Sequence, residues 1–435
     1  MIHRPARLRA FRRAAPAAFL ALAACATPKP VPAPPAGAPA APPAPAPSRF
    51  HTGDAKFDAF LEEARAEALT QGIRPDVFDA ATAGIAPLPA IAGMNANQPE
   101  FVRPVWSYLD SAVSARRVAD AQAMLARYGA VLDRIAAQSG VPRQILVAVW
   151  GMETDYGAGQ GSFPLFSALA TLAYDGARTA YARPEFFAAL RIYQEQRYPL
   201  SEMTASWAGA FGQTQFTPTT FLKYAADGDG DGRIDLWASA PDALASAARL
   251  LAAQGWKPGQ PWGFEVKLPD GFAYEDADGE TRRPLAEWRA RGVAAASGAA
   301  LPDGSDDAAI YLPAGARGPA FLLFPNFSVI LKYNNAASYA LAVGLLADRM
   351  TGGGMVQHGW PRDERPLSRD ERMRFQGELA RLGFDAGAPD GVLGRKTRAA
   401  LRLYQKSKGL AADGFATASL LAMLDADAAK AAGGL

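Results

Sequence analysis

The spacing of apolar residues predicts helices over most of residues 50–350. The segments VADAQAMLARYGAVLDRIAAQSG and PDALASAARLLAAQG carry apolar residues at three- and four-residue spacing, and each ends at a glycine. The same pattern returns in SVILKYNNAASYALAVGLLADRM. Because this spacing places the apolar side chains on one face of a helix, we expect a core made by packed helices.

A different pattern interrupts these helices between about residues 257 and 325. The stretches WGFEVKLPDGFAY and AIYLPAGARGPAFLLFPNFSVI contain short alternating or apolar runs that are separated by proline and glycine. Such runs are typical of short strands joined by turns. The expected fold class is therefore mainly α (α+β), with a small β-rich subdomain inserted into a helical domain.

Two segments without an apolar pattern divide the chain. Residues 26–48, which include PKPVPAPPAGAPAAPPAPAPS, are rich in proline and alanine and nearly uncharged, so we expect an extended, semi-stiff tether. Residues 351–366, TGGGMVQHGWPRDERP, form a second joint, a linker that begins with a glycine run. These boundaries predict a main domain over residues 49–350 and a compact module over residues 367–430.

The C-terminal module contains an internal repeat between residues 368 and 424. The pair Phe-Gln at 375–376 corresponds to Tyr-Gln at 404–405, and an Asp-Gly pair occurs at both 390–391 and 413–414. The segment is similar to the three-helix peptidoglycan-binding domain that is often attached to cell-wall enzymes. This resemblance implies that the module binds the cell wall.

The N-terminus predicts a secretory signal that ends in a lipid attachment site. Five arginines without any acid precede an apolar stretch, AAPAAFLALAAC, which is too short to span a bilayer as a helix. Its end, LAAC, resembles a bacterial lipobox, which implies cleavage before Cys25 and acylation of that cysteine. Residues 1–25 are thus expected to be a lipoprotein signal region. Ala26 is not the aspartate associated with inner-membrane retention, so the outer membrane is favoured; an ordinary signal peptide with a chance cysteine is the alternative.

The charged and reactive residues narrow the possible chemistry. The formal charge of +2 falls to about −3 once five N-terminal arginines are removed, which argues against a nucleic-acid partner. Cys25 is the only cysteine, and the three histidines are His3, His51 and His358. A Ser-His-Asp hydrolase or a His-ligated zinc enzyme is therefore not expected. Catalysis would have to use carboxylates, hydroxyls, amides or aromatic side chains.

Glu153 is the candidate acid that the apolar pattern singles out. It follows the apolar run of VPRQILVAVWGMET, near the end of a helix that should begin at Pro142 and stop at Gly157. A carboxylate there faces the negative end of the helix dipole and is partly desolvated, and both effects raise its pKa. A general acid at neutral pH needs such a pKa. The alternative is a structural glutamate that pairs with an arginine or caps a backbone amide.

Four motifs occur in an order that resembles the lytic transglycosylase B family: GVPRQILVAVWGMETDYG, LFSALATLAYD, SWAGAFGQTQFTPTTFLKYAADGDGDGRIDLW and LKYNNAASYALAV. The resemblance covers roughly residues 50–350. It implies a lysozyme-like helical catalytic domain that cleaves the β-1,4 bond between N-acetylmuramic acid and N-acetylglucosamine in peptidoglycan. The product would carry a 1,6-anhydro end, and Glu153 would be the single acid and base. A hydrolytic muramidase and a catalytically inactive peptidoglycan-binding tether are the alternatives.

The resemblance also implies substrate-binding residues. The family's active-site serine and glutamine fall in SWAGAFGQTQFTP, its wall of aromatic and amide side chains falls in KYNNAASY, and a tyrosine in VWSYLD matches more weakly. The implied substrate-binding residues are Tyr108, Ser206, Gln215, Phe216, Tyr333, Asn334 and Tyr339. For Tyr333 and Tyr339, core packing is the alternative. The sequence departs from the family pattern at positions 154–155 and 213–214.

The acidic stretch DGDGDGRIDLW matches the first half of a calcium-binding EF-hand loop. Its candidate metal ligands are Asp227, Asp229, Asp231, the backbone carbonyl of Arg233, and Asp242. Ala238 occupies position 12, where a bidentate glutamate is usual, and the resemblance implies that an aspartate after the loop closes the site. We expect a structural calcium ion and no cofactor for catalysis. A solvated Asp-Gly turn is the alternative.

These features predict where the protein works and what it contacts. We expect a monomer at the periplasmic face of the outer membrane, attached through the lipid on Cys25. Its partner would be the glycan strands of peptidoglycan, without any nucleic acid. A calcium sensor is a distant alternative because the chain has one degenerate loop and no paired EF-hand.

Overall fold

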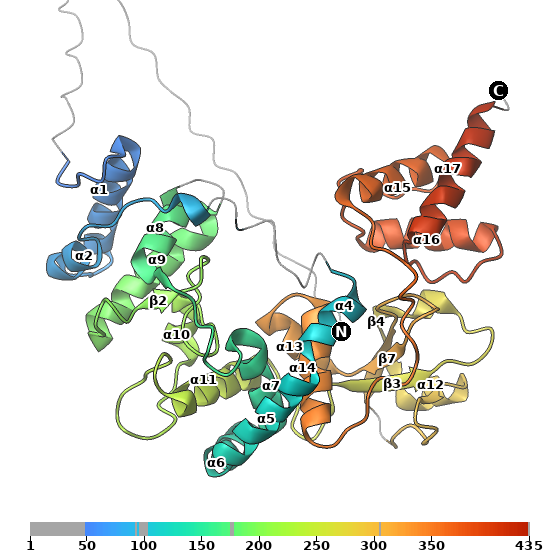
Figure 1. Ribbon diagram of the computed structural model, residues 1–435, viewed down its shortest axis with the longest axis horizontal. Helices are drawn as coiled ribbons and strands as arrows, with labels where there is room; N and C mark the ends of the chain where they lie inside the picture. Colours follow the sequence, from blue (N-terminus) through green and yellow to red (C-terminus); the bar gives the residue numbers. More distant parts are fainter. Residues whose placement is uncertain (1–47, 92–93, 95–102, 175–177, 304–305, 434–435) are drawn as a thin grey trace, which may run out of the picture. The chain divides into compact units, whose positions relative to one another are not determined.

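The computed structural model describes residues 48–91, 94, 103–174, 178–303 and 306–433, and these residues are mainly helical (Figure 1). The helices that precede the sheet are α1 (Ala55–Thr70), α2 (Pro75–Ala81), α4 (Val105–Ala112), α5 (Ala115–Arg127), α6 (Gly129–Ser139), α7 (Arg143–Thr154), α8 (Leu165–Tyr174), α9 (Thr179–Gln196), α10 (Pro218–Tyr224) and α11 (Ala240–Ala253). Short 3-10 helices occur at Pro89–Ile91 and Tyr274–Asp276. The expectation of a mainly helical main domain is confirmed.

Two of the predicted helical segments contain a break. Residues 118–140 belong to α5 and α6, which meet at Tyr128, where φ is −104° and ψ is 17°. The segment 328–350 belongs to α13 (Pro325–Tyr333) and α14 (Ala337–Met350). Apolar spacing continues across both breaks, because each pair of helices packs against the same core. Periodicity alone therefore predicts the helices without showing where they end.

The β-rich insertion forms an antiparallel sheet of five strands in the order β4-β6-β7-β3-β5. The strands are β3 (Gly263–Lys267), β4 (Asp278–Pro284), β5 (Ala294–Ala295), β6 (Asp307–Tyr311) and β7 (Ala320–Leu323). Helix α12 (Leu285–Ala290) contributes Trp288, which is fully buried and packs in one apolar cluster with Leu322 and Phe324. The predicted insertion at about 257–325 thus has its own small core. A second sheet pairs β1 (Phe163–Pro164) with β2 (Thr204–Ala205).

Two large apolar clusters form the core of the main domain. One contains buried residues of α6, α7, α11, α13 and α14, among them Leu146, Val149 and Leu341. The other joins α1 and α2 to α8, α9 and α10 through residues such as Phe57 and Phe186. No helix in the described ranges is long and apolar enough to cross a membrane. The predicted lipidation site, Cys25, lies outside the described residues.

The C-terminal module consists of α15 (Arg369–Arg381), α16 (Arg395–Ser407) and α17 (Ala418–Gly433). In its first half, Gln376 Oε1 accepts a hydrogen bond from the Gly391 amide over 2.8 Å, while its Nε2 donates to Asp390 Oδ1 over 3.0 Å. Gln405 makes the same two bonds, over 2.8 and 2.6 Å, to the Asp-Gly pair at 413–414. The internal repeat of the sequence is therefore a repeated structural unit, in which a buried glutamine holds an Asp-Gly turn.

The predicted linker at 351–366 is held against the main domain. The rings of Trp360 and Trp106 lie 6.4 Å apart, and Arg362 pairs with Asp110 over 2.7 Å. Glu265 on β3 accepts hydrogen bonds from two backbone amides of the segment, at residues 357 and 358, over 2.6 and 2.7 Å. The glycine-rich composition predicted a linker between two domains, but composition cannot predict these contacts of the linker with α4 and β3.

Candidate active site

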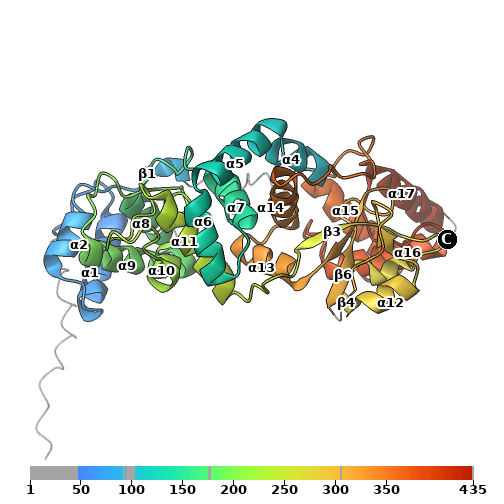
Figure 2. The ribbon, with the colours of Figure 1, turned by 90° about the horizontal axis from the view of Figure 1, so that it is seen from below.

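Helix α7 lies at the centre of the main domain, and Glu153 is in its last turn. Val147, Ala148 and Val149 are fully buried, and the helix contacts α5, α6, α11 and α14 (Figure 2). Because a close-packed interior resists movement, these contacts fix the last turn of α7. Glu153 is partly buried there, at the edge of the apolar stripe as predicted.

The end of α7 differs from the predicted stop at Gly157. The helix ends at Thr154, and the next two residues, Asp155 and Tyr156, have left-handed backbones with φ of 50° and 62°. This conformation is uncommon for residues with a side chain, although aspartate tolerates it better than most. Two consecutive left-handed residues turn the chain sharply away, directly after the catalytic candidate.

Tertiary contacts hold this turn in place. Asp155 pairs with Arg116 over 3.0 Å and with Arg117 over 3.4 Å. The hydroxyl of Tyr156 donates to the backbone carbonyl of Arg117 over 3.0 Å. Its ring lies over Gly151, where a Cβ atom would come within 2.6 Å of it. The glycine in the motif GMETDYG is thus explained by the close approach of this tyrosine.

Tyr339, near the start of α14, contacts the candidate acid directly. Its hydroxyl donates a hydrogen bond to Oε1 of Glu153 over 2.5 Å, and its side chain is only 3% exposed. Burial raises the pKa of Tyr339 well above its usual value, and the neighbouring Glu153 carboxylate raises it further. The tyrosine therefore stays protonated at neutral pH and acts as a hydrogen-bond donor to one carboxylate oxygen.

Two more tyrosines border the same site. Tyr333, at the end of α13, donates to the backbone carbonyl of Thr214 over 2.7 Å. Burial raises the pKa of Tyr333 well above its usual value, and the charge of Glu153 adds to this effect. Tyr108 on α4 is partly buried and lies near enough to Tyr339 to contribute to the raised pKa of that residue. The structure therefore brings Glu153 together with Tyr333 and Tyr339, and it places Tyr108 near Tyr339.

Asn334 and Phe216 occupy different positions relative to these tyrosines. Asn334 follows Tyr333 as the C-cap residue of α13 and is partly buried. Phe216 is 1% exposed, and its ring centroid lies 6.5 Å from that of Tyr333. Phe216 is thus almost fully buried beside this tyrosine, and its predicted contact with substrate stays a prediction.

Ser206 and Gln215 lie at the two ends of one tight loop. The Ser206 Oγ accepts from the amide of Ala210 over 3.2 Å. Gln215 has a left-handed backbone, with φ of 50°, and its Nε2 donates to the carbonyls of Gly212 and Gln160 over 3.0 and 3.2 Å. Both side chains are partly buried and bind backbone of this region. Their predicted contact with substrate stays a prediction.

The two departures from the family pattern touch each other. The hydroxyl of Thr154 donates to the backbone carbonyl of Gln213 over 2.6 Å and accepts from the amide of Gly157 over 2.9 Å. Thr154 therefore fastens the end of α7 to the loop that carries Gln215. Sequence reasoning noticed both positions without finding this role, and nothing in a single sequence connects residues that lie 59 positions apart.

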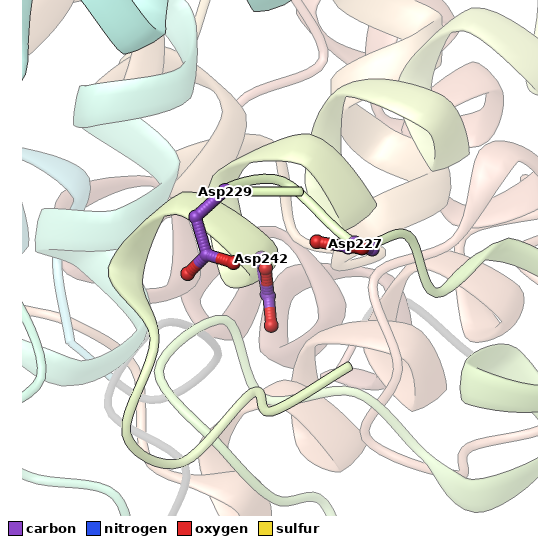
Figure 3. Close-up of side chains that lie close together, drawn as sticks. All are labelled: Asp227, Asp229 and Asp242. Atoms are coloured by element: carbon purple, nitrogen blue, oxygen red, sulfur yellow. The ribbon is translucent and has the colours of Figure 1, made fainter. Parts of the chain in front are cut away.

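Three of the predicted metal ligands form a compact carboxylate group (Figure 3). Oxygens of Asp227, Asp229 and Asp242 lie within 4.8 Å of one another. Asp242 is 1% exposed in the first turn of α11, and it accepts hydrogen bonds from the amides of Gly228 and Asp235 over 2.7 and 2.6 Å. Burial raises the pKa of Asp242, while backbone amides, that of Gly232 first, lower the pKa of Asp227. Such oxygen ligands suit calcium.

Asp231 and Arg233 lie beside this carboxylate group. Asp231 is exposed and its Oδ1 accepts from the amide of Arg233 over 2.8 Å. Within the described ranges, the carboxylates that gather closely enough for one ion are those of Asp227, Asp229 and Asp242. The guanidinium of Arg233 lies 5.1 Å from the ring centroid of Tyr198. The group of Arg233 that is predicted to bind the metal ion is its backbone carbonyl.

Comparison with known families covers most of the described chain. Residues 56–348 match the model of the Transglycosylase SLT domain family, and residues 368–424 match that of the Putative peptidoglycan binding domain. Membrane-bound lytic murein transglycosylase B of Escherichia coli (strain K12) is 32% identical over 228 residues, which are 50% of this chain. The chain spans 59% of the length of that relative.

Solved structures of related proteins agree with the fold. SltB3 from Pseudomonas aeruginosa, in complex with NAG-anhNAM-pentapeptide, is 48% identical with a TM-score of 0.82 over 86% of this chain and 100% of SltB3. The Escherichia coli lytic transglycosylase Slt35, in complex with calcium, is 25% identical with a TM-score of 0.58 over 68% of this chain and 93% of Slt35. This chain is therefore similar to one protein bound to a peptidoglycan fragment and to another bound to calcium.

Proposed function

The chain belongs to the Transglycosylase SLT domain family, and we propose that it is a lytic murein transglycosylase in which Glu153 is the single acid and base. Its substrate would be the β-1,4 bond between N-acetylmuramic acid and N-acetylglucosamine. The observation that carries the proposal is the 2.5 Å hydrogen bond from Tyr339 to Oε1 of Glu153, in a site bordered by Tyr333 and Tyr108.

The surroundings of Glu153 favour a one-carboxylate mechanism. Ordinary glycosidases place two carboxylates across the scissile bond. Asp155, the nearest acid in the sequence, is held by Arg116 and Arg117 and is thus engaged as a structural ion pair. A muramidase that uses Asp155 as its second carboxylate is therefore less well supported than a lytic transglycosylase.

The reaction can be written with Glu153 at both steps. The protonated carboxyl gives its proton to the glycosidic oxygen, and the bond from that oxygen to C1 of the muramoyl residue breaks. Glu153, now a carboxylate, accepts the proton of the muramoyl 6-hydroxyl as that oxygen bonds to C1. The product is a 1,6-anhydro end, and no water is consumed. Because Tyr339 donates to Oε1, we assign the transferred proton to Oε2.

Aromatic and amide groups around Glu153 suit a sugar substrate. Tyrosine rings offer flat apolar faces with a polar hydroxyl at the end, and amide groups bind acetamido substituents by hydrogen bonds. We assign Tyr108, Tyr333 and Asn334 to the groove wall on this basis. Thr154 then acts on the groove indirectly, because its hydroxyl holds the loop that carries Gln215. Ser206 and Gln215 keep their assignment as substrate-binding residues.

Calcium binding is the second part of the proposal. Asp227, Asp229 and Asp242 would supply the carboxylate ligands of one ion, with Asp231 and the carbonyl of Arg233 able to complete the shell. The calcium complex of Slt35 supports this assignment. The ion would join the loop to the first turn of α11, so its role would be structural.

We place the enzyme at the membrane through Cys25. The lipobox before the Pro/Ala-rich tether and the similarity to a membrane-bound relative support a lipid anchor. The module at 367–430 would then hold the cell wall, in keeping with its match to a peptidoglycan-binding domain. An inactive wall tether would need only these two features, whereas this chain also keeps Glu153 and its tyrosine partner.

Product analysis tests the proposed reaction. Purified protein is incubated with sacculi, and the released muropeptides are examined by mass spectrometry. We expect 1,6-anhydro ends, and we expect Glu153→Gln to keep its melting temperature while losing about 10²-fold or more of the release rate. Glu195→Gln, which removes an exposed carboxylate on α9, is the matched control and should behave like the wild type. Reducing ends would identify a muramidase, and no release by the wild type would favour the inactive tether.

A further inference from the structure

A pocket of about 300 Å³ lies between the β-rich subdomain and the C-terminal module. Its floor is the pair Asp278 and Tyr311, which face each other on β4 and β6. Arg398 and Arg402 line it from α16, one helical turn apart, and the turn at 413–416 closes another side. We call it the module pocket.

The module is docked here by contacts around the pocket. Asp413 Oδ2 accepts from the backbone amide of Ala316 over 2.8 Å. Arg395, on the same helix as the two pocket arginines, pairs with Glu280 on β4 over 2.7 Å. The first Asp-Gly turn of the internal repeat makes no corresponding contact in the described ranges, and Val392 beside it is 65% exposed. The two halves of the repeat therefore differ: the second half builds the wall of a pocket.

Both pocket arginines lack an ion-pair partner within the described part of the chain. The Nε of Arg402 is buried and makes no hydrogen bond there, because the side chain lies against Gly414. Arg398 donates one hydrogen bond, to the carbonyl of Leu393 over 3.0 Å. Burial lowers the pKa of Arg402, while the charge of Asp278 raises it and the charge of Arg398 lowers it. An arginine stays charged in proteins even so, and a buried charged donor without a partner is costly.

The acids of the pocket do not neutralise these arginines by direct contact. Asp278 accepts from the amides of residues 280 and 281 over 2.8 and 2.6 Å and from the Thr281 hydroxyl over 2.7 Å. Asp413 accepts from the Gln405 side chain over 2.6 Å and from two backbone amides. These hydrogen bonds hold both carboxylates in place, and among the described residues neither acid forms an ion pair with Arg398 or Arg402, so the guanidinium groups can still bind an anion.

We propose that the module pocket binds the terminal carboxylate of a peptidoglycan stem peptide, with Arg398 and Arg402 as the carboxylate-binding pair; this inference rests on the proposed function. Guanidinium groups bind carboxylates through two parallel hydrogen bonds. The fixed charges of Asp278 and Asp413 disfavour a doubly charged phosphate and favour a ligand that also carries an ammonium group. Small apolar residues complete the lining, among them Pro313, Ala337 and Ala416, which suits the methyl groups of a peptide ending in alanine.

The position of the pocket fits a peptide attached to the glycan at Glu153. Ala337 lines the pocket and begins α14, and Tyr339, two residues later, binds Glu153. Two helical residues lie about 200° apart around the axis, so the pocket and the acid face opposite sides of the first turn of α14. A five-residue peptide reaches about 17 Å when extended, more than the ~10 Å width of a helix. A stem peptide is therefore long enough to span the width of one helix, which is the separation that the start of α14 imposes between these two sides.

A binding experiment separates the carboxylate from the rest of the ligand. Full-length Glu153→Gln protein is titrated by calorimetry with a stem pentapeptide ending in D-Ala-D-Ala, and with the same peptide as its C-terminal amide. We expect the acid to bind at least about tenfold more tightly than the amide, and we expect Arg402→Gln to remove this difference. Equal binding of acid and amide, or no binding of the acid at millimolar concentration, would overturn the proposal. Displacement by an equal concentration of inorganic phosphate would identify a general anion site instead, which also overturns it.

A kinetic experiment tests the role of the pocket in turnover. The ratio of kcat/KM for peptide-bearing glycan chains to that for chains stripped of peptide is measured for each variant. We expect Arg402→Gln to lower this ratio about tenfold and Arg402→Lys, which keeps the charge but loses the planar fork, to lower it less. Arg381→Gln, which removes an exposed arginine of α15, should keep the wild-type ratio. An unchanged ratio in Arg402→Gln, with equal losses on both substrates, would show a purely structural arginine.

The two proposals can fail separately. If the calorimetry shows selective binding of the acid while no anhydro ends are formed, the proposed function is wrong and the pocket assignment stands. If anhydro ends are formed but peptide acid and amide bind alike, the pocket assignment alone is wrong. Melting temperatures of all variants identify any that fail to fold, and Arg402→Lys then carries the test.

Discussion

The hydroxyl of Thr154 makes two hydrogen bonds that can position the proposed catalytic residue, Glu153. It bonds to the loop at Gln213 and to the turn at Gly157, and it lies next to Glu153 in the chain. A buried hydroxyl with both a donor and an acceptor partner resists rotation of the last helical turn. Thr154, one of the positions where the sequence departs from the family pattern, thus links the end of α7 to the loop at Gln213.

Asp348 is a second residue whose environment has a measurable consequence. It lies in the last turns of α14, and the indole Nε1 of Trp262 donates to its Oδ2 over 3.1 Å. Burial raises the pKa of Asp348 to about 6 from its usual 3.8. The folded protein therefore binds this proton more tightly than the unfolded chain does. The contribution of Asp348 to the free energy of unfolding is therefore fully present below about pH 4, decreases between about pH 4 and pH 6, and is lost above about pH 6.

We expect Asp348→Asn to raise the melting temperature at pH 7.5. The amide oxygen can still accept from Trp262, while the buried charge is removed, which is worth up to about 3 kcal/mol for a pKa shift of this size. The gain should shrink as the pH falls from 6 and vanish near pH 4. Thermal unfolding at several pH values checks this, with the exposed Asp270→Asn as control. A melting temperature that rises equally at pH 4 and pH 7.5 would contradict the assignment.

Among the elements, α7 and the loop at 206–216 act as one unit. The helix ends in two left-handed residues, and the loop contains a third at Gln215. Such backbones persist only where the surrounding contacts fix them. Ion pairs of Asp155, the packing of Tyr156 on Gly151 and the bonds of Gln215 provide those contacts. Backbone strain is therefore concentrated around the proposed acid.

The acidic loop before α11 is the element whose stability we expect to depend on calcium. An ion that binds only the folded state stabilises it by about 2.7 kcal/mol at a concentration 100-fold above Kd. The melting temperature should therefore rise when millimolar calcium replaces EDTA. Asp229→Asn should reduce this rise because it removes one charged ligand of the group with Asp227 and Asp242.

Two comparisons complete the calcium test. Asp303→Asn removes an acid that is 98% exposed and lies outside the loop, so it should keep the full response to calcium. Magnesium should stabilise the protein less than calcium, because it demands a tighter octahedral shell. A melting temperature that is the same in EDTA and in calcium would leave the loop as a solvated Asp-Gly turn.

At the scale of the whole molecule, the C-terminal module and the main domain are joined by more than a linker. The segment 351–366 is fastened by Trp360 and Arg362, and the module itself contacts the β-rich subdomain through Asp413 and Arg395. Several of these contacts are exposed ion pairs, which individually contribute little. Together with the buried Asp-Gly turn, they place the module next to the sheet.

We expect Cys25→Ser to release the enzyme from the membrane without unfolding it. The substitution removes the sulfur that would carry the lipid, and it lies 30 positions before α1, which begins at Ala55. Fractionation of cells that express the full chain checks this, with peptidoglycan digestion as the readout of folding. Ala26→Asp keeps the cysteine and should move the protein from the outer to the inner membrane. Sedimentation of Cys25→Ser with the outer membrane, like the wild type, would contradict a lipid anchor at this residue.

Local patterns were enough to predict much of this protein. Apolar spacing identified the helices, and short apolar runs separated by proline and glycine indicated the strands of the insertion. The repeated Gln and Asp-Gly pattern predicted the structural repeat in the C-terminal module. The edge position of Glu153 followed from its place after the run that ends at Met152. Each of these features depends on residues within a few positions of one another, which is the range over which side-chain spacing and turn chemistry act.

Tertiary structure decided what depends on distant residues. The bond from Tyr339 to Glu153 joins positions 186 apart, and the bond between Thr154 and Gln213 joins positions 59 apart. The left-handed end of α7 also required arginines from another helix, so Gly157 was the wrong place to expect the stop. The module pocket is lined by residues of β4 and β6 and by residues of α16, more than 80 positions later in the chain. A sequence shows which residues are available, but long-range packing sets which of them touch and therefore which protons and charges they can share.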